Sequence, residues 1–199
     1  MEATVQTGDP GGDVLGASAA KVMILEQPAT AGASSAAAPC VRAVVQQCMS
    51  AQLMVQPSTP EDQPQFVEIQ RGIIIYLCFL RGATKAHVEK LAKMIQGIRL
   101  SEGDSGKLTS VIDLPGDVMI IPQATLGGTP KGKVMQYHKN IAKDEGMRLY
   151  SEFVSIFQKT YERNDKCLSA GTIVRYGTYG NRQVFSCQTN GPFTHLMEI

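Results

Sequence analysis

Residues 72–98, GIIIYLCFLRGATKAHVEKLAKMIQGI, decide the fold class because they place a strand directly before a helix. The strand is an apolar, β-rich run that begins at the turn residue Gly72. After Thr84 the apolar residues recur at helical spacing, namely Val88, Leu91, Ala92, Ile95 and Ile98. The longest apolar run, Ile73 to Leu80, is far shorter than the roughly 20 residues that a transmembrane helix needs, so we expect no membrane association.

The rest of the chain repeats this alternation of strands and helices. Other β-rich runs bounded by turn residues predict strands at 41–49, 53–56, 66–70, 117–121, 172–176, 183–188 and 193–199. A second amphipathic helix is predicted from about Asp144, with an apolar stripe of Met147, Tyr150, Phe153, Val154, Phe157 and Tyr161. The order of strands, helix, strands, helix, strands favours an α+β fold over a doubly wound parallel sheet.

The composition is that of one globular domain with an appendage. Of the 199 residues, 43% are hydrophobic and 19% charged, and the net charge of +1 excludes a generally polybasic nucleic-acid binder. Residues 1–39 are rich in Ala, Gly and Ser and lack both the apolar core of a secretory signal and the arginines of a mitochondrial presequence. We expect 1–39 to be a disordered extension and 40–199 to be the functional domain.

The cysteines and histidines do not predict a metal site or a catalytic cluster. The five cysteines form no CxxC pair and mostly lie in apolar runs, which indicates reduced thiols and a cytoplasmic location. The sequence has no GxSxG, no glycine-rich phosphate loop and no HExxH motif, and its three histidines lie far apart. A Cys/His or Ser/His pair assembled in space stays open, but we expect no metal and no cofactor.

Two segments rich in glycine and proline each adjoin a strand. The first, 122–128 or PQATLGG, begins with Pro122, which lacks a backbone donor and therefore weakens sheet pairing. Its small residues leave main-chain N–H groups open to a ligand, although an ordinary turn would also explain them. The second, 189–195 or TNGPFTH, is typical of a hairpin turn, and its Gly191–Pro192 bond can be cis or trans.

In this order, the two segments resemble the D-aminoacyl-tRNA deacylase family, whose signatures are Ser-Gln-x-Thr after a strand and Asn-x-Gly-Pro-x-Thr near the C-terminus. The resemblance covers most of 41–199 and implies an α+β fold of antiparallel and mixed sheets that close in a barrel-like way, with two main helices. In the usual family Ser, Phe and Asn stand where this chain has Pro122, Ala124 and Thr189, and these three residues look like the animal-type tRNA deacylase branch. That branch is associated with removing L-alanine mischarged on threonine tRNA.

The resemblance also implies the roles of individual residues. Gln123, Ala124 and Thr125 would face the ester through backbone groups, with the substrate ribose hydroxyl helping to activate water. The Thr125 hydroxyl would orient that water rather than attack. The partner would be a second copy of the chain, a homodimer in which the Gly191–Pro192 segment reaches the other subunit's site. The residues expected to bind the substrate are Pro122, Leu126, Gly127, Asn190, Gly191, Pro192, Phe193 and Thr194.

The basic residues suggest how mischarged aminoacyl-tRNA would be held. The interval between Asp117 and Asp144 contains four lysines and no acid, a pattern that suits a phosphate backbone but also a solvated loop. We expect Lys131, Lys133, Lys139 and Arg182 to contact tRNA. Two alternatives to L-alanyl-tRNA hydrolysis stay open: a strict D-aminoacyl-tRNA deacylase, and a non-catalytic module that binds a tRNA end or DNA. Activity on glycyl-tRNA also stays open.

Overall fold

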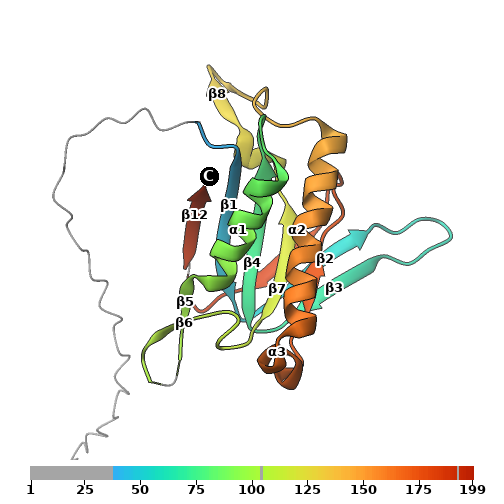
Figure 1. Ribbon diagram of the computed structural model, residues 1–199. Coiled ribbons are helices and arrows are strands. Elements are labelled where there is room, and N and C mark those ends of the chain that lie inside the picture. Colours follow the sequence, from blue (N-terminus) through green and yellow to red (C-terminus); the bar gives the residue numbers. More distant parts are fainter. Residues whose placement is uncertain (1–37, 104, 192) are drawn as a thin grey trace, which may run out of the picture. The chain divides into compact units, whose positions relative to one another are not determined.

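The computed structural model describes residues 38–103, 105–191 and 193–199, and these form one compact unit (Figure 1). Residues 1–37, which make up nearly all of the expected N-terminal extension, lie outside this part. In the described residues no helix is long and apolar enough to cross a membrane.

The centre of the fold is a mixed five-stranded sheet with the strand order β10-β7-β4-β1-β12. Its strands are β1 (Val41–Cys48), β4 (Gly72–Phe79), β7 (Asp117–Pro122), β10 (Val174–Tyr176) and β12 (Thr194–Glu198). β1 is antiparallel to both β4 and β12, whereas β4, β7 and β10 run parallel to one another. The parallel pairing brings the ends of β4 and β7 to the same edge of the sheet.

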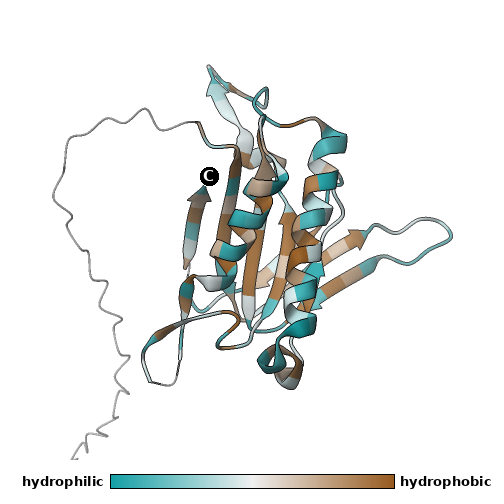
Figure 2. Cartoon of the chain, in the orientation of Figure 1, coloured by the Kyte–Doolittle hydropathy of each residue, from teal (hydrophilic) through white to brown (hydrophobic). Residues whose placement is uncertain are grey.

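Two long helices, α1 (Lys85–Gly97) and α2 (Lys143–Arg163), cover one face of this sheet (Figure 1). Figure 2 shows apolar central strands beneath helices whose outer faces are mostly hydrophilic. Both apolar stripes join one core with the odd-numbered strand residues Val41, Ala43 and Val45. The prediction of two main helices is confirmed, except that Met147 is 47% exposed because Gly146, Leu149 and Tyr150 take the inward positions of that turn.

The opposite face is partly covered by a three-stranded antiparallel sheet, β11-β2-β3, made of β11 (Phe185–Gln188), β2 (Ser50–Gln56) and β3 (Gln65–Ile69). It packs on Ile74, Met119 and Ile121 from the central strands. The barrel-like closure is not confirmed, because among the described residues the central sheet is open and has β10 and β12 as its two outer strands.

Four short strands and a third helix were not predicted from the sequence. The strands form two hairpins, β5 (Arg99–Glu102) with β6 (Leu108–Ser110) and β8 (Thr129–Lys131) with β9 (Val134–Gln136). Helix α3 (Asp165–Ala170) is capped by Asn164, whose side chain accepts hydrogen bonds from the next turn. Each of these elements is too short to show a clear period of two or of 3.6 residues.

A buried carboxylate fixes the start of β7. The side chain of Asp117 accepts hydrogen bonds from the amides of Gln70 (2.8 Å) and Ile173 (2.9 Å), which precede β4 and β10. One side chain therefore sets the level at which three parallel strands begin. From this start, the register brings Pro122 opposite Leu77 at the other end of β7.

Candidate functional site

The first motif forms a tight turn where β7 ends. The Gln123 amide still donates to the Leu77 carbonyl (2.8 Å), and the chain then enters a 3₁₀ turn, η1 (Ala124–Gly127). The first N–H groups of such a turn have no acceptor within it. No hydrogen bond from the Ala124 or Thr125 amide to another described residue is present. That these main-chain donors face a ligand stays a prediction.

The turn borders a cavity of about 330 Å³. Its walls come from the end of β4, from residues 122–125, from Asn140, Ile141 and Lys143, and from residues 179–182. Of the residues predicted from the sequence, the structure brings Pro122, Gln123, Ala124, Thr125 and Arg182 together here. The Thr125 side chain is exposed, and its hydroxyl makes no hydrogen bond to another described residue.

The charge of this pocket is positive. Lys143 and Arg182 line it, no aspartate or glutamate does, and neither cation forms a salt bridge with a described residue. Burial raises the pKa of the Cys78 thiol and of the Tyr179 hydroxyl, so both groups are neutral at physiological pH. The pocket therefore suits an anionic ligand, and its described lining contains no carboxylate, thiolate or phenolate.

Two residues of the first motif lie behind the pocket rather than on its wall. The Leu126 carbonyl accepts a hydrogen bond from Arg42 Nη1 at 2.9 Å. Gly127 is buried, and the Asn140 side chain occupies the space that a Cβ atom would need. Leu126 and Gly127 thus shape the turn from behind, and a direct contact with substrate stays a prediction.

The second motif lies at the other end of the sheet within one chain. Thr194 pairs with Gln46, whereas Met197 lies level with Ala43, Leu77 and Pro122. The two motifs are therefore separated by three strand spacings, roughly 14 Å, and by a further ~10 Å along the strands. Phe193 and Asn190 are exposed there. Pro192, and with it the state of the Gly191–Pro192 bond, lies outside the described residues.

The predicted tRNA-binding residues spread over the surface near the first motif. Lys131 and Lys133 lie on the β8–β9 hairpin, and Lys139 precedes the pocket residue Asn140. These lysines and Arg182 are all exposed. None of the four forms a salt bridge with a residue in the described ranges.

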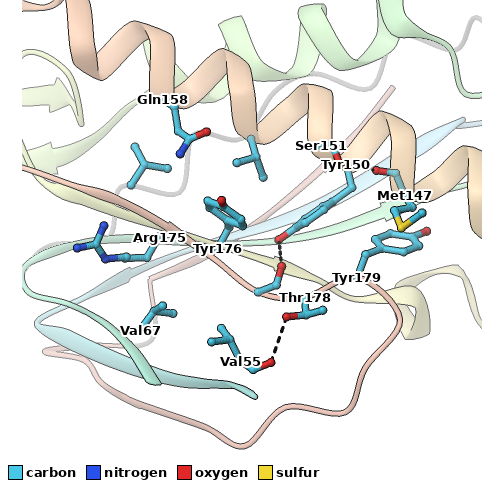
Figure 3. A pocket seen from close by; sticks show the side chains of 13 residues that line it. Val55, Val67, Met147, Tyr150, Ser151, Gln158, Arg175, Tyr176, Thr178 and Tyr179 are labelled. Atoms are coloured by element: carbon cyan, nitrogen blue, oxygen red, sulfur yellow. Dashed lines mark hydrogen bonds between the residues drawn. The ribbon is translucent and has the colours of Figure 1, made fainter. Parts of the chain in front are cut away.

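A larger cavity of about 710 Å³ adjoins the first and shares Tyr179 with it (Figure 3). It opens between α2, β10 and the β2–β3 hairpin. The Tyr150 hydroxyl lies at its floor, 2.9 Å from the carbonyl oxygens of Ile120 and Gly177, and Thr178 donates to the Val55 carbonyl (3.1 Å). Burial raises the pKa of Tyr150 far above its ordinary value, so this hydroxyl is a structural donor.

Sequence reasoning missed Asn140, Lys143 and Tyr179 as pocket residues. Asn140 and Tyr179 come from loops without a motif, and nothing in their sequence context places them beside residues 122–125. The acid-free interval between Asp117 and Asp144 contained Lys143, and that interval is the one signal that pointed to it.

Comparison with known proteins identifies the family. Residues 44–198 match the family model described as D-Tyr-tRNA(Tyr) deacylase. The chain is 52% identical over 158 residues to "D-aminoacyl-tRNA deacylase 2" of Gallus gallus, covering 79% of this chain and 95% of the relative. It is 50% identical over 161 residues to the Homo sapiens protein of the same name, covering 81% and 96%.

Solved structures agree with the sequence relatives. A "probable eukaryotic D-amino acid tRNA deacylase" superposes with a TM-score of 0.68 at 26% identity, covering 80% of this chain and 99% of that one. The "c-Myc DNA Unwinding Element Binding Protein" superposes with a TM-score of 0.66 at 26% identity, covering 79% and 98%. The chain therefore belongs to the D-aminoacyl-tRNA deacylase family, on its animal-type branch, and is a hydrolase of the aminoacyl-tRNA ester bond.

Proposed function

We propose that the pocket at the end of β7 binds the aminoacylated end of tRNA and hydrolyses the ester of D-aminoacyl-tRNA. One observation carries this proposal: the amides of Ala124 and Thr125 have no acceptor among the described residues, and they border a pocket with two cations and no acid. Backbone donors placed in this way stabilise the negative charge that develops on an ester carbonyl oxygen during hydrolysis.

The chemistry needs no ionised protein group. In the proposed complex, the ester carbonyl accepts hydrogen bonds from the Ala124 and Thr125 amides, while the neighbouring ribose hydroxyl helps to activate a water molecule. The Thr125 hydroxyl orients that water. A 10⁴-fold acceleration requires a barrier lower by about 5.5 kcal/mol. Positioning and one or two oriented donors supply an energy of that size.

The amino-acid preference has two candidates. The names of the relatives favour D-aminoacyl-tRNA over the L-alanyl-tRNA that was expected from the motif variants. L-Alanyl-tRNA is kept as the second candidate because the exposed Ala124, in place of the family's aromatic residue, gives the pocket wall a different shape.

A second copy of the chain would complete the site. Within one chain Thr194 and the rest of β12 lie far from the pocket, so the described residues of the second motif have no route to the same ester. The outer strand β12 also presents Leu196, which is 63% exposed, next to its cross-strand partner Val44 on the sheet face opposite the helices. We propose a homodimer in which Leu196 and Val44 are buried and each second motif covers the partner's pocket.

The exposed cations would hold the tRNA body. Arg182 lines the pocket, Lys139 precedes the pocket residue Asn140, and Lys131 and Lys133 lie on the β8–β9 hairpin. Contacts from such residues to phosphates position a nucleic acid without reading its sequence.

A deacylation assay tests the function. Purified protein is incubated with D-tyrosyl-tRNA and, separately, with L-alanyl-tRNA, and ester loss is compared with the spontaneous rate. We expect rapid loss of the D-ester. Parallel assays of Ala124→Phe and Ala124→Gly show whether the side chain at position 124 sets the ratio of the deacylation rates for D-tyrosyl-tRNA and L-alanyl-tRNA. Binding of charged tRNA with the ester left intact would contradict the proposal.

A further inference from the structure

We propose that Asn140 is a positioning residue, which aims and polarises the Thr125 amide through the peptide group between Ala124 and Thr125. This inference rests on the proposed function, because it assumes that the Thr125 amide faces the ester. The juxtaposition that carries it is the hydrogen bond from Asn140 Nδ2 to the Ala124 carbonyl oxygen, at 2.9 Å.

The geometry of the peptide group links this bond to the catalytic donor. The Ala124 carbonyl and the Thr125 N–H belong to one planar trans unit, so they point in opposite directions. A donor that holds the carbonyl on one side therefore fixes the direction of the N–H on the other. A hydrogen bond to the carbonyl also polarises the amide and makes its N–H a stronger donor.

The Asn140 side chain is itself held in place. The backbone amide of Asn140 donates to the Tyr137 carbonyl (3.0 Å), and the backbone amide of Ile141 donates to the Phe79 carbonyl (3.2 Å) at the end of β4. Asn140 also forms an isolated antiparallel β-bridge with Leu80, the residue that follows β4. Its backbone is therefore anchored at the end of the strand whose Leu77 carbonyl accepts from Gln123. The donor and the turn thus share one rigid support.

The oxygen of the Asn140 side-chain amide packs against the turn at Gly127. Asn140 Oδ1 is buried, makes no hydrogen bond within the described part of the chain, and lies where a Cβ atom of residue 127 would be. Residue 127 must therefore be glycine while Asn140 is present. The Cys78 thiol, 3.7 Å from the Ala124 carbonyl, is a much weaker donor and does not replace the amide.

The substitution Asn140→Asp tests the positioning role because the two side chains have the same shape. At neutral pH the introduced carboxylate places an acceptor against the Ala124 carbonyl oxygen, and the two oxygens repel. We expect kcat to fall about 10- to 100-fold at pH 7.5, with a smaller change in KM. At lower pH the introduced carboxyl gains a proton, donates to Ala124 again, and kcat recovers toward the unchanged protein.

The measured quantity is the ratio of kcat between the variant and the unchanged protein from pH 5 to 8. The other ionisable groups near residue 140 are Cys78, Lys143, Tyr179 and Arg182 in the pocket and the exposed Tyr137, His138 and Lys139. All seven are common to both proteins, so their own effects cancel in the ratio. A purely structural role for Asn140 would give a loss that does not recover on acidification.

Asn181→Asp is the matched control. Asn181 lines the same pocket and is exposed, and it makes no hydrogen bond to η1. This variant adds the same charge near the anionic substrate, so we expect a higher KM and a kcat ratio that does not change with pH. Equal pH-dependent losses of kcat in both variants would overturn the positioning role, because charge alone would then explain the effect.

Amide NMR separates a failure of this inference from a failure of the proposed function. Shifted resonances for residues 124–127 in Asn140→Asp, together with unchanged kcat, would show that the turn moved without effect and would contradict the proposed site. Unshifted resonances and unchanged kcat would overturn the positioning role of Asn140 and leave the proposed function standing. Shifted resonances with a pH-reversible loss of kcat are the expected result.

Discussion

Arg42 Nη1 donates a hydrogen bond of 2.9 Å to the Leu126 carbonyl oxygen, which ties the first strand to the turn that borders the pocket. The same guanidinium pairs with Glu198 near the end of β12 through Nε, at 2.6 Å. Arg42 therefore links three distant segments, and its planar fork suits two acceptors at once.

Loss of this link should loosen η1. We expect Arg42→Ala to lower kcat about three- to tenfold, because a small displacement of the turn misaligns its amides. Arg42→Lys keeps the charge but cannot bind both partners in the same geometry, so it should restore part of the loss at most. Single-turnover deacylation measures the effect. A kcat for Arg42→Ala equal to that of the unchanged protein would show that the Leu126 carbonyl needs no donor from β1.

The exposed lysines of the β8–β9 hairpin should contribute to tRNA binding. We expect the double variant Lys131→Ala, Lys133→Ala to bind tRNA more weakly and to lower the slope of log Kd against log salt by up to about 2. The variant Lys90→Ala, Lys93→Ala removes the same charge from exposed positions on α1 and is the matched control. Filter binding at several salt concentrations measures both. Equal slopes for the two double variants would remove the hairpin from the tRNA footprint.

The proposed homodimer predicts a loss of activity from a position far from the pocket. Leu196→Asp places a charge at the exposed leucine of β12, and we expect a monomer with little deacylase activity, because the second motif no longer reaches the partner's pocket. Leu168→Asp on α3 is the control, since Leu168 is 58% exposed and lies on another element. Sedimentation gives the mass. An active monomer of Leu196→Asp would contradict a shared site.

The buried carboxylate at the start of β7 should stabilise the fold. Asp117→Ala leaves the amides of Gln70 and Ile173 without their acceptor, and each buried unpaired donor costs about 1–3 kcal/mol. Asp117→Asn keeps one acceptor oxygen and should lose less. Urea unfolding gives the two free energies, and an Asp117→Ala protein as stable as the unchanged one would show that water replaces both bonds.

The buried Cys48 thiol and the half-buried Tyr76 hydroxyl, which pack between the central and the three-stranded sheets, should make stability fall at alkaline pH. Burial raises the pKa of Cys48 from 9.0 to about 11 and that of Tyr76 from 10.0 to about 12. The native state therefore keeps protons that the unfolded state has already released. The free energy of unfolding should decrease as the pH rises from about 9 toward 12. Tyr76→Phe should make the free energy of unfolding fall less steeply in the upper part of this pH range. The same pH dependence in Tyr76→Phe and in the unchanged protein would contradict the raised pKa of Tyr76.

The parts of the fold that sequence predicts well are those with a long periodic pattern. The strand and helix within residues 72–98 are found where expected, because a nearly continuous apolar run and a helical stripe are hard to mistake. The β8–β9 hairpin carries no such pattern in its three-residue strands. Met147 continues the apolar stripe by composition, yet packing turns that side of α2 outward.

The candidate site also contains residues that a local sequence pattern predicts and residues that only the packing brings into place. Residues 122–125 are predicted because proline and small residues after a strand are a local signal. Asn140 and Tyr179 reach the pocket only because β4, β7 and α2 are packed as they are, and no local pattern encodes that arrangement. The place of the second motif likewise depends on strand order, since β12 pairs with β1 at the far side of the sheet from β7.

The most direct measurement replaces the Thr125 amide itself. Incorporating the α-hydroxy analogue of threonine at position 125 turns its N–H into an ester oxygen and keeps the side chain. We expect kcat for the preferred aminoacyl-tRNA to fall about 100-fold, the usual cost of removing one donor to a developing oxyanion. Thr125→Val, which removes only the hydroxyl, should lose less. A backbone-substituted protein with undiminished kcat would contradict catalysis by main-chain amides at this turn.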